Sequence, residues 1–314
     1  MRSEFEFIRN IKKKFALGRV GDDCAVLPKD PKTDLVVTTD MLVEDVDFRL
    51  DWTRPEFLGH KALAVSLSDI AAMGAKPKWA LLSIGIPERD WRGKFVDKFY
   101  EGWIELAKSY RVELVGGDVS RSPDKIVIDS IVMGEVPKGS AILRSGAKVG
   151  DSIFVTGSLG GAAAGLAILE SGKNYSSIRG SERKLVDRHL LPFPRIEVAR
   201  RLRRYANSMI DVSDGLSADL HHVCDASRVG ARLDLDKIPI DPALRSAGSD
   251  HIRNFVLAGG EDFELLFSSK TNFFSDVESV AITRIGEITS QPGIVELIVD
   301  GRTDRLPRAG YRHF

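Results

Sequence analysis

The chain has 314 residues, of which 43% are hydrophobic and 29% are charged. Its 45 basic and 45 acidic side chains balance, which argues against a nucleic-acid partner because such proteins normally carry a basic excess or patch. The length exceeds what one hydrophobic core usually supports, so we expect two domains.

The cysteines and the N-terminal segment bear on the cellular compartment. Cys24 and Cys224 are far apart and form no C-x-x-C motif, which predicts neither a disulfide framework nor a zinc site. Glu4 and Glu6 stand where a signal peptide would have its apolar core. No apolar run approaches the ~18 residues of a membrane span. We therefore expect a cytoplasmic protein with no membrane partner.

Strand-like and helical patterns alternate in the first half of the chain. Apolar residues recur at helical spacing over residues 59–73 and 91–110. A polar, glycine-containing stretch at residues 137–151 is the best candidate for a domain boundary, so we expect domains over residues 1–138 and 139–314. Short apolar runs rich in strand-forming residues predict β-strands at residues 35–39, 79–86, 112–115 and 126–132.

The second half begins with an expected strand at residues 152–156 and a helix of small residues at 160–170. Two domains that mix helices and strands in this order predict an α+β fold rather than a simple doubly wound sheet. The other expected elements are helices at 182–189, 194–205 and 216–226, and strands at 209–212, 231–235, 263–268, 281–285 and 294–299.

Two acidic motifs near the N-terminus adjoin apolar runs. Asp22 and Asp23 stand side by side before an apolar segment, and an exposed Asp-Asp turn is the alternative to a functional site. Thr38, Thr39 and Asp40 end a predicted strand with oxygen ligands of the kind that suit magnesium. Threonine and aspartate also close strands commonly, so this motif alone is weak.

Asp69 is the acid in an otherwise apolar and small-residue helix that begins near Lys61. A carboxylate packed there must be paired or metal-bound, because burying it alone costs several kcal/mol. A salt bridge to Lys61 or another base is the alternative to a metal site, and the helix alone does not decide between the two.

Three more motifs place acids beside glycines. Asp118 follows a double glycine at a strand end, which allows either a close ligand or a tight turn. Asp211, Ser213 and Asp214 occupy a strand-to-helix turn, where Ser213 or Asp214 would make an ordinary helix N-cap. A cap does not explain Asp211. The third motif follows the glycine pair 259–260 and contains Glu261, Asp262 and Glu264.

The absent motifs narrow the function further. The chain has no P-loop, no protein-kinase signature, no zinc-ligand spacing of histidines and no nucleophile elbow. Six acidic motifs without a P-loop lysine indicate that metal ions replace the basic residues that usually hold phosphates. The residues therefore predict an enzyme that handles a nucleotide phosphate through magnesium.

Taken in chain order, these motifs resemble the thiamine-monophosphate kinase family, and the match runs from about residue 4 to the C-terminal residues 310–314. The resemblance implies the two-domain fold of aminoimidazole ribonucleotide synthetase, with a mixed α/β N-terminal domain that binds ATP and metal and forms a homodimer, and an α/β C-terminal domain. It also implies transfer of the γ-phosphoryl group of ATP to thiamine monophosphate, giving thiamine diphosphate. Direct in-line transfer without a covalent enzyme intermediate is expected.

The resemblance also implies roles for individual residues. Several magnesium ions are expected, with potassium as an additional candidate ion, while Asp22 and Asp262 receive no role. The implied magnesium ligands are Asp23, Thr38, Thr39, Asp40, Asp69, Asp118, Asp211 and Asp214. The implied ATP contacts are Gly117, Asp118, Arg144 and Ser213, and the implied contacts to the thiamine side are Asp47, Glu261 and Tyr311.

The sequence departs from the family pattern at two positions. Asp47 stands where a histidine often contacts the thiamine moiety, and its carboxylate could instead face the cationic thiazolium ring. Ser66 stands where asparagine is usual, and we give this change no functional weight.

Two alternative functions are weighed against the kinase. Hydrogenase-maturation and selenophosphate-forming enzymes of the same superfamily depend on a functional cysteine near a terminus, whereas Cys24 precedes an apolar run and Cys224 lies in a predicted helix. A non-catalytic magnesium-nucleotide sensor is the second alternative, and the intact set of implied ligands argues against it.

Overall fold

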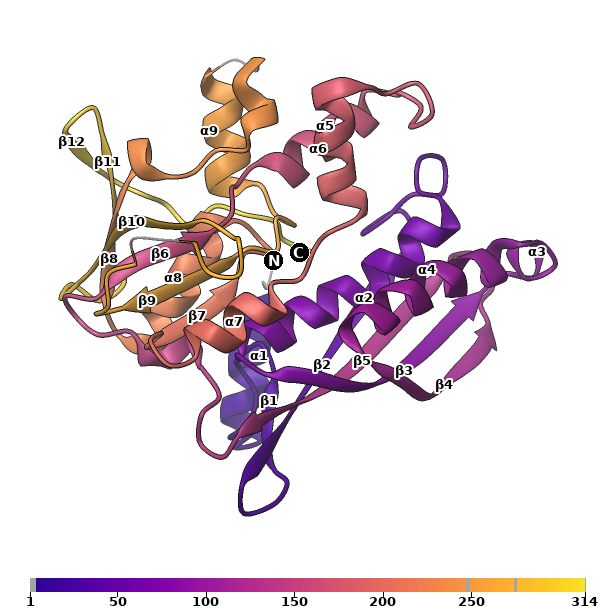
Figure 1. The fold of residues 1–314 in the computed structure, drawn as a ribbon, viewed down its shortest axis with the longest axis horizontal. Helices are drawn as coiled ribbons and strands as arrows, with labels where there is room; N and C mark the ends of the chain where they lie inside the picture. Colours follow the sequence, from indigo (N-terminus) through magenta and orange to yellow (C-terminus); the bar gives the residue numbers. More distant parts are fainter. Residues whose placement is uncertain (1–3, 247–248, 274–275, 314) are drawn as a thin grey trace.

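The computed structural model describes residues 4–246, 249–273 and 276–313. Two β-sheets lie side by side, with helices packed against both and a long helix, α2, at their junction (Figure 1). This mixed arrangement confirms the predicted α+β class.

The first sheet has five strands in the order β1-β2-β5-β3-β4. All neighbouring pairs are antiparallel except β3 and β4, which are parallel. The strands are β1 (Ala25–Pro28), β2 (Thr33–Val43), β3 (Lys76–Ile86), β4 (Glu113–Arg121) and β5 (Val127–Pro137).

Helices α2 (Pro55–Ala72) and α4 (Phe95–Tyr110) cover one face of the first sheet (Figure 1). Glycines let the two helices approach closely: a Cβ on Gly59 would lie 1.9 Å from the carbonyl oxygen of Phe99. A Cβ on Gly102 would lie 1.8 Å from that of Glu56, so any larger residue would separate the helices. The same half contains α1 (Glu4–Lys14) and the short α3 (Glu88–Trp91).

The second sheet has seven strands in the order β12-β11-β8-β10-β6-β9-β7. Its pairs are antiparallel except β11 and β8. The strands are β6 (Ser152–Thr156), β7 (Ser208–Asp211), β8 (Gly230–Asp234), β9 (Leu265–Ser269), β10 (Ile282–Thr289), β11 (Val295–Val299) and β12 (Arg302–Arg305).

The helices of the second half pack on the two faces of this sheet and at its end. Phe154 faces α7 while the adjacent Ile153 faces α8, as strand alternation requires. The helices are α5 (Gly161–Glu170), α6 (Gly180–Leu190), α7 (Ile196–Leu202), α8 (Leu216–Ser227) and α9 (Ser249–Ala258). Short 3-10 turns are η1 (Arg144–Gly146), η2 (Leu235–Lys237) and η3 (Pro242–Ser246).

One hydrophobic core runs from the first sheet through α2 into the second sheet. Leu63 and Leu67 of α2 share this core with Leu202 of α7 and Met209 of β7. Because α2 packs against elements of both halves, it is buried nearly all round. The last turn of α2 is thereby placed beside the end of β7.

Most expected elements form, but the predicted helix 91–110 is wrong in extent. The chain forms α3, leaves helical hydrogen bonding around Gly93, and restarts as α4. The expected strand 112–115 continues as β4 through the double glycine to Arg121. The elements β1, α9 and β12 were not predicted from the sequence.

No helix in the described part of the chain is both long and apolar enough to cross a membrane.

Candidate metal centre and substrate site

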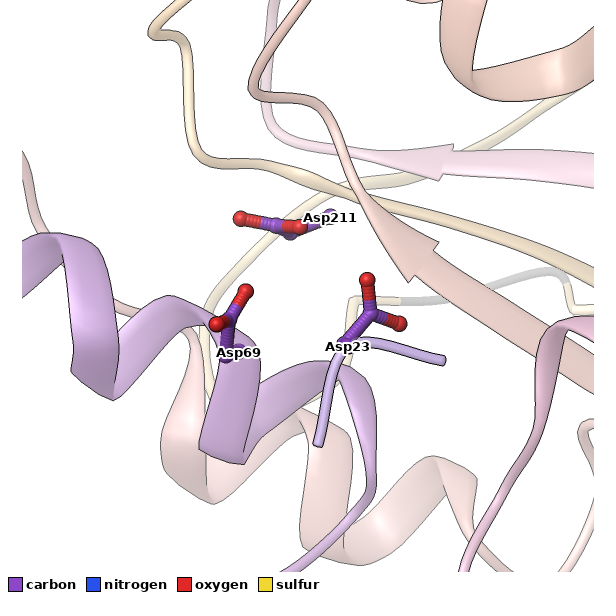
Figure 2. A group of neighbouring side chains, drawn as sticks. All are labelled: Asp23, Asp69 and Asp211. Carbon is purple, nitrogen blue, oxygen red and sulfur yellow. The ribbon is translucent and has the colours of Figure 1, made fainter. Parts of the chain in front are cut away.

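The carboxylates of Asp23, Asp69 and Asp211 converge on one space between the two sheets (Figure 2). One oxygen from each residue lies within 4.8 Å of the others. Asp23 comes from the segment before β1, Asp69 from the last turn of α2 and Asp211 from the end of β7. Three acids far apart in the sequence therefore form one cluster.

Asp69 owes its position to the helical repeat of α2. Spacings of seven and eight residues place Ser68 and Asp69 on the same helix face as Lys61. The hydroxyl of Thr38 donates a hydrogen bond to Asp69. Within the described residues no basic side chain forms an ion pair with Asp69, and Lys61 pairs with Glu261 instead. The alternative of a salt bridge between Lys61 and Asp69 is therefore wrong.

Neighbouring side chains hold the other two acids. Ser68 donates a hydrogen bond of 2.6 Å to Asp211. The Arg144 guanidinium donates to Asp23, with its Nε 3.1 Å from Oδ1. Asp22, which received no role from the sequence, accepts the backbone N–H of Arg144 at 2.8 Å and so orients that arginine. The site is thus assembled from segments on both sides of residue 138.

Burial and mutual repulsion perturb these carboxyl groups. Burial and the charge of Asp23 raise the pKa of Asp211 to about 7, against the hydrogen bond from Ser68. Burial and the charges of Asp40 and Asp211 raise the pKa of Asp69 well above its usual range. Crowded acids of this kind are favourable when a cation neutralises them.

The donor set fits a hard divalent cation. Burial raises the pKa of Asp40 to about 6, and its Oδ2 atom is buried without a hydrogen-bond partner among the described residues. An unpartnered buried oxygen costs free energy unless something neutralises or ligates it. Carboxylate and hydroxyl oxygens without a histidine or cysteine ligand suit magnesium rather than zinc.

The start of α8 does not use its polar residues as helix caps. The N-cap residue is Gly215, and no side chain caps it. The alternative that Ser213 or Asp214 is the N-cap is therefore wrong. The carboxylate of Asp219 accepts the N–H of Gly215 at 3.0 Å from within the helix. Ser213 and Asp214 lie half-buried beside the cluster residue Asp211.

A second charged group lies beside the acidic cluster and contains Glu261. Lys61 Nζ lies 2.7 Å from one carboxylate oxygen of Glu261, and His189 Nδ1 lies 2.9 Å from the other. The charges of Asp47 and Glu261 act on the Tyr311 phenol, where burial and these charges raise the pKa. Asp47 and Glu261 therefore lie close enough to Tyr311 for their charges to act on its phenol.

The acids that follow Glu261 are structural. Asp262 accepts the backbone N–H groups of Gly160 at 2.6 Å and Ala162 at 3.1 Å, so it stabilises the beginning of α5. Glu264 is fully buried and accepts hydrogen bonds from Thr156 at 2.6 Å and from Arg195 at 2.5 and 2.7 Å. These contacts fix the backbone on the C-terminal side of Glu261.

Two predicted ligand positions lie away from the cluster. The hydroxyl of Thr39 donates to Asp129 at 2.6 Å on the opposite face of β2 from Thr38. Gly117 and Asp118 lie on the edge strand β4, which is three strand spacings, about 14 Å, from β2. A Cβ on Gly117 would lie 1.9 Å from a carbonyl oxygen of β3, which accounts for the glycine.

Ser68 and His189 are parts of the site that were not predicted from the sequence. The signal for Ser68 was a polar residue adjoining Asp69 on a buried helix face, which needs a partner. No sequence signal marked His189, because its partner Glu261 lies 72 positions further along the chain.

Known proteins resemble this chain over its whole length. Residues 21–136 match the N-terminal domain of AIR synthase related proteins, and residues 148–298 match their C-terminal domain. The thiamine-monophosphate kinase of Escherichia coli K12 is 40% identical over 317 residues, covering 99% of this chain and 95% of the relative. That of Bacillus subtilis is 36% identical, covering 94% and 93%.

A solved structure described as AaThiL complexed with AMPPCP and TMP superposes with a TM-score of 0.89, at 36% identity, covering 99% of this chain and 97% of that one. The two domains and the site between them define an AIR synthase related protein. Within that class, the chain belongs to the thiamine-monophosphate kinase family, which confirms the resemblance of the motifs.

Proposed function

We propose that this chain transfers the γ-phosphoryl group of ATP to the phosphate of thiamine monophosphate, giving thiamine diphosphate and ADP. The observation that carries this proposal is the cluster of Asp23, Asp69 and Asp211, assembled in a chain that aligns over 99% of its length with a thiamine-monophosphate kinase. A phosphate oxygen of the acceptor attacks the γ-phosphorus of ATP, and the bond between the γ-phosphorus and the bridging oxygen of ADP breaks.

Magnesium is the metal that we propose for the acidic cluster. Bound magnesium would neutralise charge on both the phosphate oxygens and the carboxylates. The central ligands would be Asp23, Asp69 and Asp211, with Thr38 and Asp40 beside them and Asp214 at the start of α8. Thr39 and Asp118 would serve a separate ion, because they lie on the other face or at the sheet edge. Potassium is a further ion to test.

The nucleotide would lie along the junction of the two halves. Arg144 has one face turned to Asp23 and remains a fifth exposed, so it can meet a phosphate while balancing that acid. Ser213 is half-buried two residues beyond Asp211, and its hydroxyl would contact the nucleotide. In this proposal, Gly117 and Asp118 contact the nucleotide away from the central cluster, on the exposed edge strand β4.

The acceptor would bind against Asp47, Glu261 and Tyr311. The two carboxylates suit the positive charge of a thiazolium ring, and a tyrosine ring adds an aromatic surface for it. Asp47 is held in place by the N–H of Val43, which donates to its carboxylate at 2.8 Å.

A covalent enzyme intermediate is not part of this proposal. Cys24 and Cys224 are both buried, and burial raises the pKa of the Cys224 thiol to about 12, which disfavours a thiolate nucleophile. The rate would then come from positioning and from neutralising charge on the transferred group. The buried cysteines also disfavour the alternative of a cysteine-dependent enzyme.

We also propose a homodimer formed through the N-terminal domain, with the domain boundary between residues 138 and 139. The face of the first sheet opposite α2 carries uncovered apolar side chains: Met41 is 62% exposed, and Ile131 and Leu81 form a half-buried cross-strand pair. The polar pair of Thr39 and Asp129 lies between them on the same face. No helix in the described chain covers this face along β5 and β3 (Figure 1). An uncovered apolar sheet face of this kind marks an interaction surface.

A phosphoryl-transfer assay with ATP and magnesium tests the proposed function. Thiamine monophosphate, thiamine and an aminoimidazole ribonucleotide precursor are compared as acceptors, with and without potassium. Formation of thiamine diphosphate from thiamine monophosphate alone is the expected result. Binding of ATP without any product would favour the non-catalytic sensor, and product from another acceptor would overturn the substrate assignment.

A further inference from the structure

Lys61 and His189 reach the carboxylate of Glu261 from opposite halves of the molecule. Lys61 belongs to α2 and lies 2.7 Å from one oxygen, while His189 belongs to α6 and lies 2.9 Å from the other. The side chains of Lys61 and His189 are 1% and 5% exposed, whereas that of Glu261 is 29% exposed. A bound molecule can therefore touch Glu261 but cannot reach Lys61 without displacing it.

The three groups form an electrically balanced set. Burial would raise the pKa of Glu261, but the nearby Lys61, with a smaller contribution from His189, outweighs it and holds that pKa at about 2. Burial and the charge of Lys61 lower the pKa of His189, so the ring is neutral near pH 7, with its Nδ1 2.9 Å from the Glu261 carboxylate. Glu261 thus stays anionic with Lys61 as its counter-ion.

The backbone of Glu261 is fixed as firmly as its side chain. Its φ angle of 66° is left-handed, a conformation that costs a non-glycine residue about 1 kcal/mol or more and persists when the surroundings enforce it. The N–H of Glu261 donates to the carbonyl of Ser213 at 2.8 Å. On the other side, Asp262 and Glu264 are anchored to α5 and Arg195.

We propose that Lys61 and His189 are positioning residues that aim the Glu261 carboxylate at the cationic part of the acceptor. This inference rests on the proposed function, in which Glu261 contacts the acceptor. A glutamate side chain on a loop would otherwise lose conformational entropy when the acceptor binds, and holding it from two sides removes that cost beforehand. Loss of Lys61 should therefore weaken acceptor binding more than it slows phosphoryl transfer.

A double-mutant cycle tests the inference with Lys61→Met, Glu261→Gln and the double variant. We expect Lys61→Met to raise the KM for thiamine monophosphate roughly 10-fold, with the KM for ATP unchanged and kcat changed less. Because Lys61 acts through Glu261, the double variant should be no worse than the more damaged single variant. Calorimetric binding of thiamine monophosphate in the presence of AMPPCP should give the same coupling.

Three further variants serve as controls for the effect of Lys61→Met. Lys61→Arg keeps the positive charge and should recover part of the lost affinity, while His189→Asn should raise the same KM without adding charge. Lys173→Met removes an exposed lysine paired with Glu182 and should change nothing. If Lys61→Met does not fold, as judged by thermal unfolding, the arginine and asparagine variants decide the question through the same KM.

The inference is overturned if the wild type turns over normally and the lysine and histidine variants leave the KM for thiamine monophosphate unchanged. Additive effects in the double variant would also overturn it, because Lys61 would then act independently of Glu261. A wild type that makes no thiamine diphosphate would instead refute the proposed function, so the two failures are distinguishable.

Discussion

The hydroxyl of Ser68 donates a hydrogen bond of 2.6 Å to the carboxylate of Asp211, joining α2 to the end of β7. Both groups are buried, so this bond aligns an acid from the second sheet with the acids of the first half. The acidic cluster therefore forms only when the two halves are packed together, so the proposed metal binding should depend on that packing.

Stability without metal should decrease as the pH rises. The pKa of Asp211 is about 7 in the folded protein and ~3.9 in an unfolded chain, so between these values the folded state binds more protons than the unfolded state. The free energy of unfolding must then fall from pH 5 to pH 8. Asp40, with a pKa of about 6, and Asp69 act in the same direction. Urea unfolding in EDTA at several pH values measures this slope.

Excess magnesium should abolish that slope, because metal ligands bind in their ionised form and ion binding competes with protons. The rise in Tm on adding magnesium should accordingly be larger at pH 8 than at pH 6. Asp211→Asn should flatten the slope in EDTA. Equal slopes with and without magnesium would refute a cation site at the cluster.

Asp69→Asn should lower kcat by roughly 100-fold or more, because it weakens neutralisation of the transferred phosphoryl group. In EDTA the variant should be at least as stable as the wild type, since an amide cannot ionise in the crowded cluster as the pH rises. The stabilisation by magnesium should be largely lost. Steady-state kinetics and thermal unfolding measure these effects, and Asp97→Asn on the exposed face of α4 is the matched control. Near-normal turnover would remove Asp69 from the metal site.

The α+β class and the long helices followed from periodicity, because their apolar spacing is a local property of the sequence. Which acids meet is a property of the packing. Thr38 and Thr39 are adjacent, yet strand alternation sends one toward Asp69 and the other toward Asp129. The alternation of side chains along a strand is local, so it could have predicted that Thr38 and Thr39 face opposite sides of the sheet. The position of Asp118 on an edge strand depends on long-range strand pairing, which local sequence does not determine.

The partners of buried charges were the least predictable feature. The sequence allows Lys61 as a partner of Asp69, eight residues away, but the structure pairs it with Glu261, 200 residues away. Helix geometry puts Lys61 and Asp69 on one face, two turns apart, which is too far for an ion pair. Lys61 pairs with Glu261 because the second half of the chain packs against α2, and the local sequence does not predict that packing.

Asp47→Ala should raise the KM for thiamine monophosphate roughly 10-fold and leave the KM for ATP unchanged, because it removes a carboxylate from the proposed cation-binding surface. The same change also deletes the hydrogen bond to Val43. Asp47→Asn keeps an acceptor for that bond and removes the charge, so it should raise the KM as well. An unchanged KM in Asp47→Ala would refute the contact, and a normal Asp47→Asn would reduce Asp47 to a structural role.

Ile131→Arg should dissociate the proposed homodimer, because it places a long charged side chain among the uncovered apolar side chains of this sheet face, next to Leu81. Sedimentation equilibrium or mass photometry would show a monomer where the wild type is a dimer. Val149→Arg is the control. Val149 is also an exposed apolar residue, at 56%, but it belongs to the turn between β5 and β6 and not to the first sheet. A monomeric wild type, or an Ile131→Arg dimer of undiminished strength, would refute this interface.

Glu264→Gln should lower the free energy of unfolding by about 3–5 kcal/mol, because it leaves the guanidinium of Arg195 buried without its counter-ion. Arg188, 3.3 Å from Glu264, would lose part of its partner as well. Urea unfolding measures the change. Glu182→Gln is the matched control, because the pair of Glu182 and Lys173 is nearly half exposed and should contribute less than about 1 kcal/mol.

Since Glu264 fixes the chain three residues beyond Glu261, Glu264→Gln should also raise the KM for thiamine monophosphate. Equal destabilisation by the two changes would mean that water or another group compensates Arg195, and the anchoring role of Glu264 would fall.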